Sequence, residues 1–173
     1  DRPVRVVLVD DDPHIRLVIA KELLADSRID LIAQAGTVRE GRRLIAIHDF
    51  DVMMVDLNLG DGSGYDLIEQ MKAGRPFAEA VVISAMEDAE HALRAFELGA
   101  TGYLVKNSWF GDFPQAVLQV VNGGASITPV LARRLLRKLS GRPCEAIPAA
   151  QTGTQTESLT ARERDVLKMV AAG

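Results

Sequence analysis

Short apolar runs alternate with stretches of helical periodicity over residues 4–124. The runs are rich in Val and Ile and lie at Val4–Val9, Asp30–Ala35, Asp51–Val55, Ala80–Ser84 and Gly102–Val105. Because they are apolar at successive positions, they indicate strands that are buried on both faces. Amphipathic stretches follow them, the last marked by Phe113, Ala116, Val117, Val120 and Val121. The alternation predicts an α/β fold: a doubly wound (βα)₅ parallel sheet with helices on both faces.

The pattern changes after the glycines at 123 and 124, which end the fifth predicted helix. Thr128-Pro129 is typical of a helix start and predicts a helix over residues 129–139. Residues 141–158 are rich in Pro, Gly, Thr and Gln, and we expect a flexible linker there. Thr160 and Glu163 fit a capping box, which predicts one further helix. We therefore divide the chain into a domain at 1–124, a linker at 125–158 and a final helix at 159–173.

The overall charge and the cysteine content narrow the class of protein. The chain has 24 acidic and 20 basic residues and a formal charge of −4, which does not suit a protein built around nucleic acid. Cys144 is the only cysteine, so no internal disulfide is possible. No apolar run reaches the ~18 residues that a membrane span needs. We expect a cytoplasmic protein without membrane association.

Polar residues with matching chemistry follow four of the predicted strands. These are Asp10–Asp12, Asp56, Ser84 and Lys106. The carboxyl ends of parallel strands share one edge of a sheet, so these side chains should converge there. Oxygen ligands of this kind suit Mg²⁺, and a carboxylate can attack phosphorus to form an acyl phosphate while Mg²⁺ and a lysine offset the negative charge. The residues indicate an acceptor of phosphoryl groups, not an enzyme that turns over small molecules.

Four ordered motifs resemble those of receiver domains in two-component response regulators. They are Val9-Asp10-Asp11-Asp12-Pro13, Val55-Asp56-Leu57-Asn58-Leu59, Ile83-Ser84-Ala85 and Gly102-Tyr103-Leu104-Val105-Lys106. The resemblance covers residues 4 to about 123 and implies the flavodoxin-like strand order 2-1-3-4-5. Many receivers have Lys-Pro after the fifth strand, whereas Lys106-Asn107 is similar to receivers of the NarL/FixJ type.

The resemblance also implies roles for individual residues. Asp56 would be the phosphoacceptor, Lys106 would pair with the phosphate, and Ser84 would bond a phosphoryl oxygen. The implied ligands of Mg²⁺ are Asp10, Asp11, Asp56 and the backbone carbonyl of Asn58. Tyr103 would change rotamer when Ser84 moves inward. The positions that would tune the lifetime of the phosphate are Asn58 and Met86.

Several of these residues have a simpler interpretation. Asp12 is either a ligand of the metal or only the cap of the following helix. Tyr103 is either the switching aromatic or an ordinary aromatic at the rim of the site. Residues 61–64 are interpreted as a turn with permissive glycines and not as a phosphate cradle.

The last residues resemble the opening of a LuxR-type helix-turn-helix domain, through Leu159-Thr160-x-Arg162-Glu163; an ordinary capped helix is the alternative. The resemblance implies a truncated transcription regulator, phosphorylated by a sensor histidine kinase and dimeric when phosphorylated. DNA would be bound through a part of the output domain that lies beyond Gly173.

Two other functions remain possible at this point. A phosphatase of the haloacid dehalogenase type also uses Asp, Ser and Lys, and Asp10-x-Asp12 resembles its nucleophile motif. Such an enzyme would leave Asp56 without a role. A receiver that is never phosphorylated and serves only as an interaction module is the third hypothesis.

Overall fold

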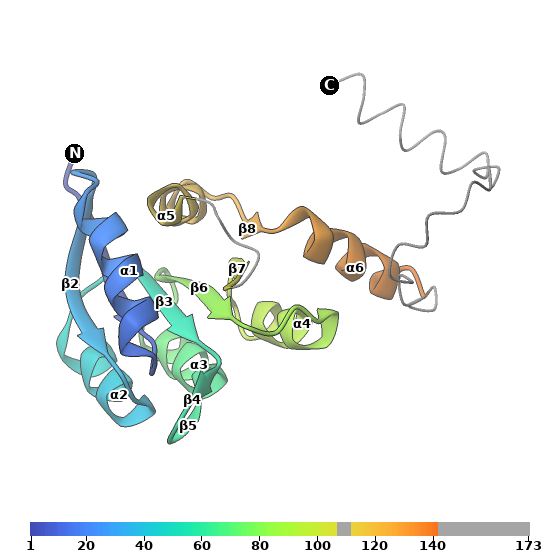
Figure 1. Ribbon diagram of the computed structural model, residues 1–173, viewed down its shortest axis with the longest axis horizontal. Coiled ribbons are helices and arrows are strands. Elements are labelled where there is room, and N and C mark those ends of the chain that lie inside the picture. The colour runs from blue at the N-terminus through green and yellow to red at the C-terminus, as the bar shows by residue number, and fades with distance from the viewer. Residues whose placement is uncertain (107–111, 142–173) are drawn as a thin grey trace.

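The computed structural model describes residues 1–106 and 112–141. Its main feature is a parallel sheet of six strands in the order β2-β1-β3-β6-β7-β8, with helices on both faces (Figure 1). The strands are β1 (Val4–Val9), β2 (Ile29–Ala35), β3 (Val52–Asp56), β6 (Glu79–Ser84), β7 (Gly102–Val105) and β8 (Ser126–Ile127). The helices are α1 (Pro13–Leu24), α2 (Val38–Ile47), α3 (Gly64–Gly74), α4 (Ala89–Glu97), α5 (Phe113–Val121) and α6 (Pro129–Leu139).

The predicted strand order 2-1-3-4-5 is confirmed, because the five predicted strands are β1, β2, β3, β6 and β7. Three short strands were not predicted. β4 (Asn58–Leu59) and β5 (Gly62–Ser63) form a hairpin directly after β3, and β8 adds a sixth strand beside β7. Each has only two residues, which is too short for an apolar pattern to be recognised.

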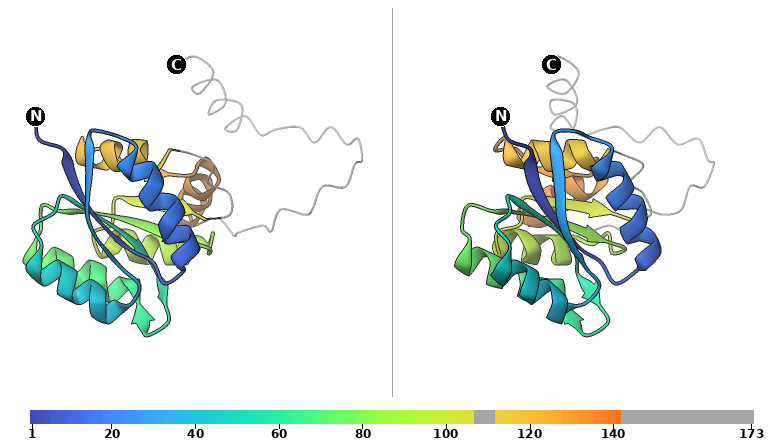
Figure 2. Two further views of the ribbon diagram at one scale, coloured as in Figure 1. Left: turned by 60° about the vertical axis from the view of Figure 1, so that its left-hand side comes forward. Right: turned by 90° about the vertical axis from the view of Figure 1, so that its left-hand side faces the viewer.

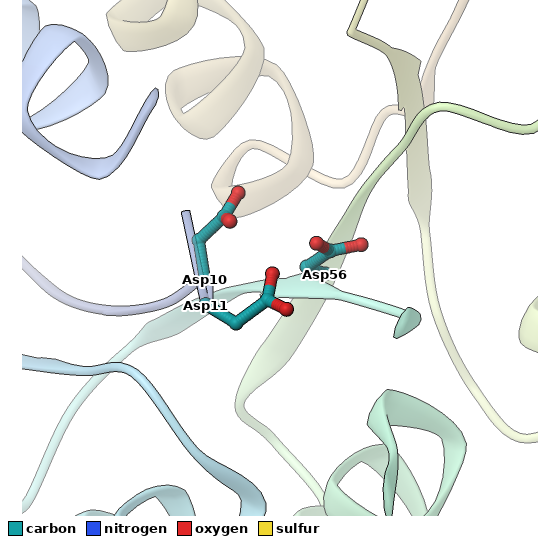
Figure 3. Close-up of side chains that lie close together, drawn as sticks. All are labelled: Asp10, Asp11 and Asp56. Atoms are coloured by element: carbon teal, nitrogen blue, oxygen red, sulfur yellow. The ribbon is translucent and has the colours of Figure 1, made fainter. Parts of the chain in front are cut away.

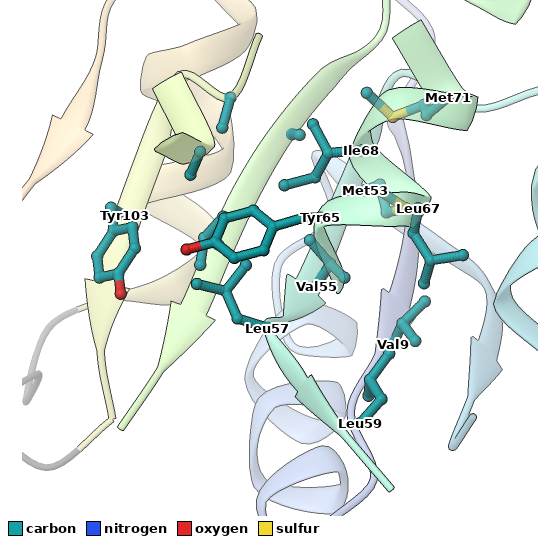
Figure 4. Packing of buried hydrophobic residues seen from close by; sticks show 14 of the residues in the cluster. Val9, Met53, Val55, Leu57, Leu59, Tyr65, Leu67, Ile68, Met71 and Tyr103 are labelled. Carbon is teal, nitrogen blue, oxygen red and sulfur yellow. The ribbon is translucent and has the colours of Figure 1, made fainter. Parts of the chain in front are cut away.

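Two apolar clusters lie on opposite faces of the sheet, since successive strand residues point to opposite sides. One cluster joins Val6, Leu8 and Met54 to the buried faces of α1 and α5. The other joins the alternate strand residues to α2, α3, α4 and α6 (Figure 4). Figure 2 shows α1 and α5 together on one side of the sheet and α2 with α3 on the other. The sheet is therefore buried on both faces, as the continuous apolar runs predicted.

The segment after α5 packs on the domain. β8 pairs with β7 through Gly102 opposite Ser126 and Tyr103 opposite Ile127. α6 then lies against α4 and buries Leu131 and Leu135 in the same cluster as α4. Residues 142–173, with the predicted flexible linker and final helix, lie outside the described residues. Within the described residues, no helix is both long and apolar enough to cross a membrane.

Candidate functional site

The four predicted strand ends meet at one edge of the sheet. Asp10 and Asp11 follow β1, Asp56 ends β3, and Figure 3 shows the three side chains close together at this edge. One carboxylate oxygen from each of these residues lies within 4.8 Å of the others. Neighbouring strands β3 and β6 pair Asp56 with Ile83, the residue before Ser84. The parallel topology thus brings together Asp10 and Asp56, which are 46 positions apart in the chain.

Lys106 joins the two buried carboxylates of this cluster. Its Nζ lies 2.8 Å from Asp10 Oδ2 and 2.8 Å from Asp56 Oδ2. Burial alone would lower the pKa of Lys106, but its hydrogen bonds with the two carboxylates outweigh this and raise it. Burial also raises the pKa of Asp56, against the opposing effect of the Lys106 ammonium. Three carboxylates facing one ammonium leave the cluster with an excess of negative charge.

The donor set of this cluster fits a divalent cation. All the candidate ligands are oxygens, which Mg²⁺ prefers. Asp10 is fully buried, and the Lys106 ammonium is shared between its Oδ2 and Asp56 Oδ2, at 2.8 Å from each. One ammonium does not offset three clustered carboxylates, and buried negative charge is costly unless further positive charge meets it. Asp10, Asp11 and Asp56 are therefore the residues that could hold the ion, and the cation would offset their mutual repulsion.

Ser84 and Tyr103 lie beside this cluster and share one loop as a partner. Ser84 is fully buried, and its Oγ accepts a hydrogen bond from the Met86 amide at 3.1 Å. Tyr103 is also fully buried, and its hydroxyl donates to the Met86 carbonyl at 2.8 Å. The Tyr103 ring thus lies inside the domain, and its change of rotamer stays a prediction. Both side chains hold the loop between β6 and α4.

Asp12 caps a helix. Its Oδ1 accepts hydrogen bonds from the amides of His14 and Ile15, at 2.9 and 3.3 Å, and these bonds lower the pKa of Asp12. This satisfies donors of the first turn of α1 that would otherwise lack partners. Asp12 does not join the three clustered carboxylates. The capping interpretation explains both hydrogen bonds that the Asp12 side chain makes.

The β4–β5 hairpin contains a steric constraint that the sequence did not reveal. A Cβ on Gly64 would lie 2.2 Å from the Asp56 carbonyl oxygen, so only glycine fits there. Asn58 donates its amide to Asp56 Oδ1 at 3.2 Å. Asp61 accepts from the amides of Val38 and Arg39, which ties the hairpin to the start of α2. Residues 61–64 thus lead from the hairpin into α3, and neither Gly62 nor Gly64 has the positive φ for which a permissive glycine was expected. Gly64 is required by its close approach to Asp56, which had no signal in the sequence.

Comparison with known proteins gives one family and many relatives. A model of the response regulator receiver domain family matches residues 6–118. The nitrate/nitrite response regulator protein NarL of Escherichia coli (strain K12) is 28% identical over 175 residues, which is 99% of this chain and 76% of the relative. The DNA-binding transcriptional activator DevR/DosR of Mycobacterium tuberculosis (strain H37Rv) is 29% identical over 170 residues, with 98% and 75% covered.

Solved structures show the same fold. A two-component response regulator of the LuxR family from Aurantimonas sp. superposes with a TM-score of 0.74 at 25% identity, covering 80% of this chain and 99% of the other. The isolated receiver domain of RcsB from Salmonella enterica superposes with a TM-score of 0.71 at 20% identity, covering 78% and 99%. The second likeness concerns the fold alone.

Proposed function

The chain belongs to the response regulator receiver domain family and is a two-component response regulator of the NarL/LuxR type. We propose that Asp56 is its phosphoacceptor. The observation that carries this proposal is the position of the Asp56 carboxylate. It is 4% exposed, ends a strand, contacts the Lys106 ammonium at 2.8 Å and clusters with two further carboxylates. Asp10 is less suitable as the acceptor, because it is completely buried.

The proposed reaction is transfer of a phosphoryl group from a phosphohistidine of a sensor kinase. A carboxylate oxygen of Asp56 attacks phosphorus, the P–N bond breaks, and the imidazole nitrogen keeps the electron pair and takes up a proton. An acyl phosphate on Asp56 results. Lys106, already 2.8 Å from Asp56, is placed to pair with the phosphoryl oxygens.

Mg²⁺ is the proposed cofactor, and when bound it would offset the charge of the phosphoryl oxygens. Asp10, Asp11 and Asp56 would hold it, with the backbone carbonyl of Asn58 as the fourth protein ligand. The backbone amide of Asn58 contacts Asp56, and that of Met86 contacts Ser84, which supports the proposal that these two positions tune the lifetime of the acyl phosphate.

The proposed switch is the loop between β6 and α4. Ser84 Oγ accepts from Met86 and so keeps its own hydroxyl proton available for a phosphoryl oxygen. The same loop holds Tyr103 at the Met86 carbonyl and the Arg134 guanidinium of α6 at the Glu87 carbonyl. A change at Asp56 would thus reach α6 through a single loop by favouring one of two arrangements.

The output of the switch is proposed to be transcription. DevR/DosR is described as a DNA-binding transcriptional activator, and residues 159–173 are proposed to begin a helix-turn-helix domain of this kind. We keep the proposed division into a receiver at 1–124, a linker at 125–158 and an output segment at 159–173. A sensor histidine kinase and a second copy of the chain complete the proposed partners.

Treatment with a small phosphodonor and Mg²⁺ tests the phosphoacceptor. Intact-protein mass spectrometry should show one added phosphoryl group on the wild-type chain and none on Asp56→Asn. Asp12→Asn is the matched control, since Asp12 caps α1 and should leave the uptake unchanged. Equal uptake by the Asp56→Asn and wild-type chains would disprove the role of Asp56.

The family assignment contradicts the hypothesis of a haloacid-dehalogenase-type phosphatase. Its nucleophile would be Asp10, with Asp12 as the second acid of the motif. Asp12 instead caps α1, and the family that matches the chain consists of receiver domains.

A further inference from the structure

Arg16 makes an unusual contact with the turn that carries the acidic residues. Its Nη1 donates a hydrogen bond to the Asp10 carbonyl oxygen at 2.6 Å. Among the described residues, Arg16 has no carboxylate within ion-pair distance, although this turn carries Asp10 and Asp11. Its hydrogen-bonding capacity is thus directed at the backbone and not at an acid.

The Asp10 carbonyl belongs to the peptide that leads into Asp11. The preceding Asp10 amide donates to the Ala35 carbonyl at 3.0 Å, and Asp10 Oδ1 accepts from the Asp12 amide at 2.9 Å. The Asp11 side chain itself is exposed and makes no hydrogen bond with the described residues. The backbone alone therefore fixes the position from which the Asp11 carboxylate reaches a cation, and Arg16 holds the peptide that leads into Asp11.

Gly36 provides the space for this contact. A Cβ built on Gly36 would lie 3.0 Å from Arg16 Nη1 and 3.9 Å from the Asp10 carbonyl oxygen. The backbone of Gly36 does not require glycine, because its φ is not positive. Glycine at position 36 is thus explained by the Arg16 guanidinium, which is the flexible group that an added methyl would displace.

From these contacts we propose that Arg16 is a positioning residue for the divalent cation, acting by fixing the Asp10–Asp11 peptide. This rests on the proposed Mg²⁺ site. Two physical effects of Arg16 have opposite signs. As a cation near an acidic cluster it weakens Mg²⁺ binding, whereas as an orienting donor it strengthens Mg²⁺ binding. Residues that orient metal ligands typically contribute about 10–100-fold in metal affinity, so orientation should dominate.

Titration with Mg²⁺, followed by backbone amide NMR shifts, separates the two effects. We expect Arg16→Met to weaken Mg²⁺ binding about 10-fold, whereas loss of the charge alone would tighten it. Arg16→Lys, which keeps one donor, should recover most of the affinity. Arg43→Met removes an exposed arginine that makes no side-chain hydrogen bond with the described residues and should leave the affinity unchanged.

A double-mutant cycle with Gly36→Ala gives an independent check. Gly36→Ala should weaken Mg²⁺ binding in the wild-type chain and have no effect in the Arg16→Met chain, because the displaced guanidinium is then absent. The melting temperature of each variant without Mg²⁺ shows that the fold is retained.

The outcomes are distinct. An Arg16→Met chain that binds Mg²⁺ as tightly as the wild type, or more tightly, overturns the role of Arg16. A wild-type chain that does not bind Mg²⁺ contradicts the proposed cofactor instead.

Discussion

Tyr103 shows how burial changes the chemistry of one residue. Its ring lies in the apolar cluster that Figure 4 draws, and only its hydroxyl meets a polar group, the Met86 carbonyl. Removing the phenol from water disfavours the phenolate. Burial therefore raises the pKa of Tyr103 to about 12. The protonated hydroxyl is the form that can donate to Met86 and hold the loop.

The raised pKa of Tyr103 predicts a loss of stability at alkaline pH. The folded-state pKa is about 12 and the ordinary value is 10.0, so the stabilisation is complete below pH 10 and disappears as the pH rises toward 12. A Tyr65→Phe chain keeps Tyr103 as the only tyrosine. Its phenolate absorbance should rise near pH 12, and circular dichroism should show unfolding over the same pH range. Ionisation near pH 10 in a folded chain would contradict the burial of this hydroxyl.

The sequence could identify the clustered residues but not how each is held. Asp10, Asp56, Ser84 and Lys106 were predictable because parallel strands deliver their carboxyl ends to one edge. The contact of Arg16 with a backbone carbonyl was not, since it depends on a side-chain rotamer that no spacing reveals. The same applies to Gly64, whose close approach to Asp56 follows from the path of a hairpin.

At the scale of elements, α6 was predicted as a helix but not as part of the domain. Its sequence is strongly basic on the outside, which resembles a solvated linker. Leu131 and Leu135, however, lie four positions apart on one face and are buried against α4. Lys138 pairs with Glu90 of α4 at 3.2 Å, but the Glu90 side chain is 83% exposed, so this pair contributes little and the leucines account for most of the packing energy.

Truncating a buried leucine of α6 tests this packing. Leu131 is fully buried, so Leu131→Ala should lower the free energy of unfolding by about 2–5 kcal/mol in urea denaturation. Leu136 is 68% exposed on the same helix, and Leu136→Ala should change the free energy of unfolding by less than about 0.5 kcal/mol. Equal effects of the two substitutions would mean that α6 does not pack on α4 in solution.

β8 shows why the ends of elements are harder to predict than their cores. The five long strands have four to seven residues each and were recognised by continuous apolar runs. β8 has two residues, and only the pairing of Ser126 and Ile127 with β7 makes it a strand. Pairing with the neighbouring strand β7, and not a pattern in its own sequence, determines the conformation of β8.

For the whole molecule, the loop between β6 and α4 connects the phosphoacceptor site to the C-terminal helix. Ser84 contacts this loop from the site, Tyr103 from the sheet, and Arg134 from α6. These three contacts lie within two consecutive residues, Met86 and Glu87. A displacement of the loop would change the contact with Arg134 of α6, because the same short stretch of backbone carries all three partners.

This shared loop predicts a reciprocal coupling. If occupancy of the Asp56 site favours the docked position of α6, then loosening α6 must weaken ligand binding at Asp56 by the same factor. Arg134→Gln should therefore weaken the binding of beryllium fluoride with Mg²⁺ by roughly 5-fold, the lower end of typical couplings, as measured by NMR titration. Arg133 lies next to it and is exposed, so Arg133→Gln is the matched control. If both variants bind beryllium fluoride like the wild type, α6 packs on the domain without sensing the state of Asp56, and the signal must leave the receiver by another surface.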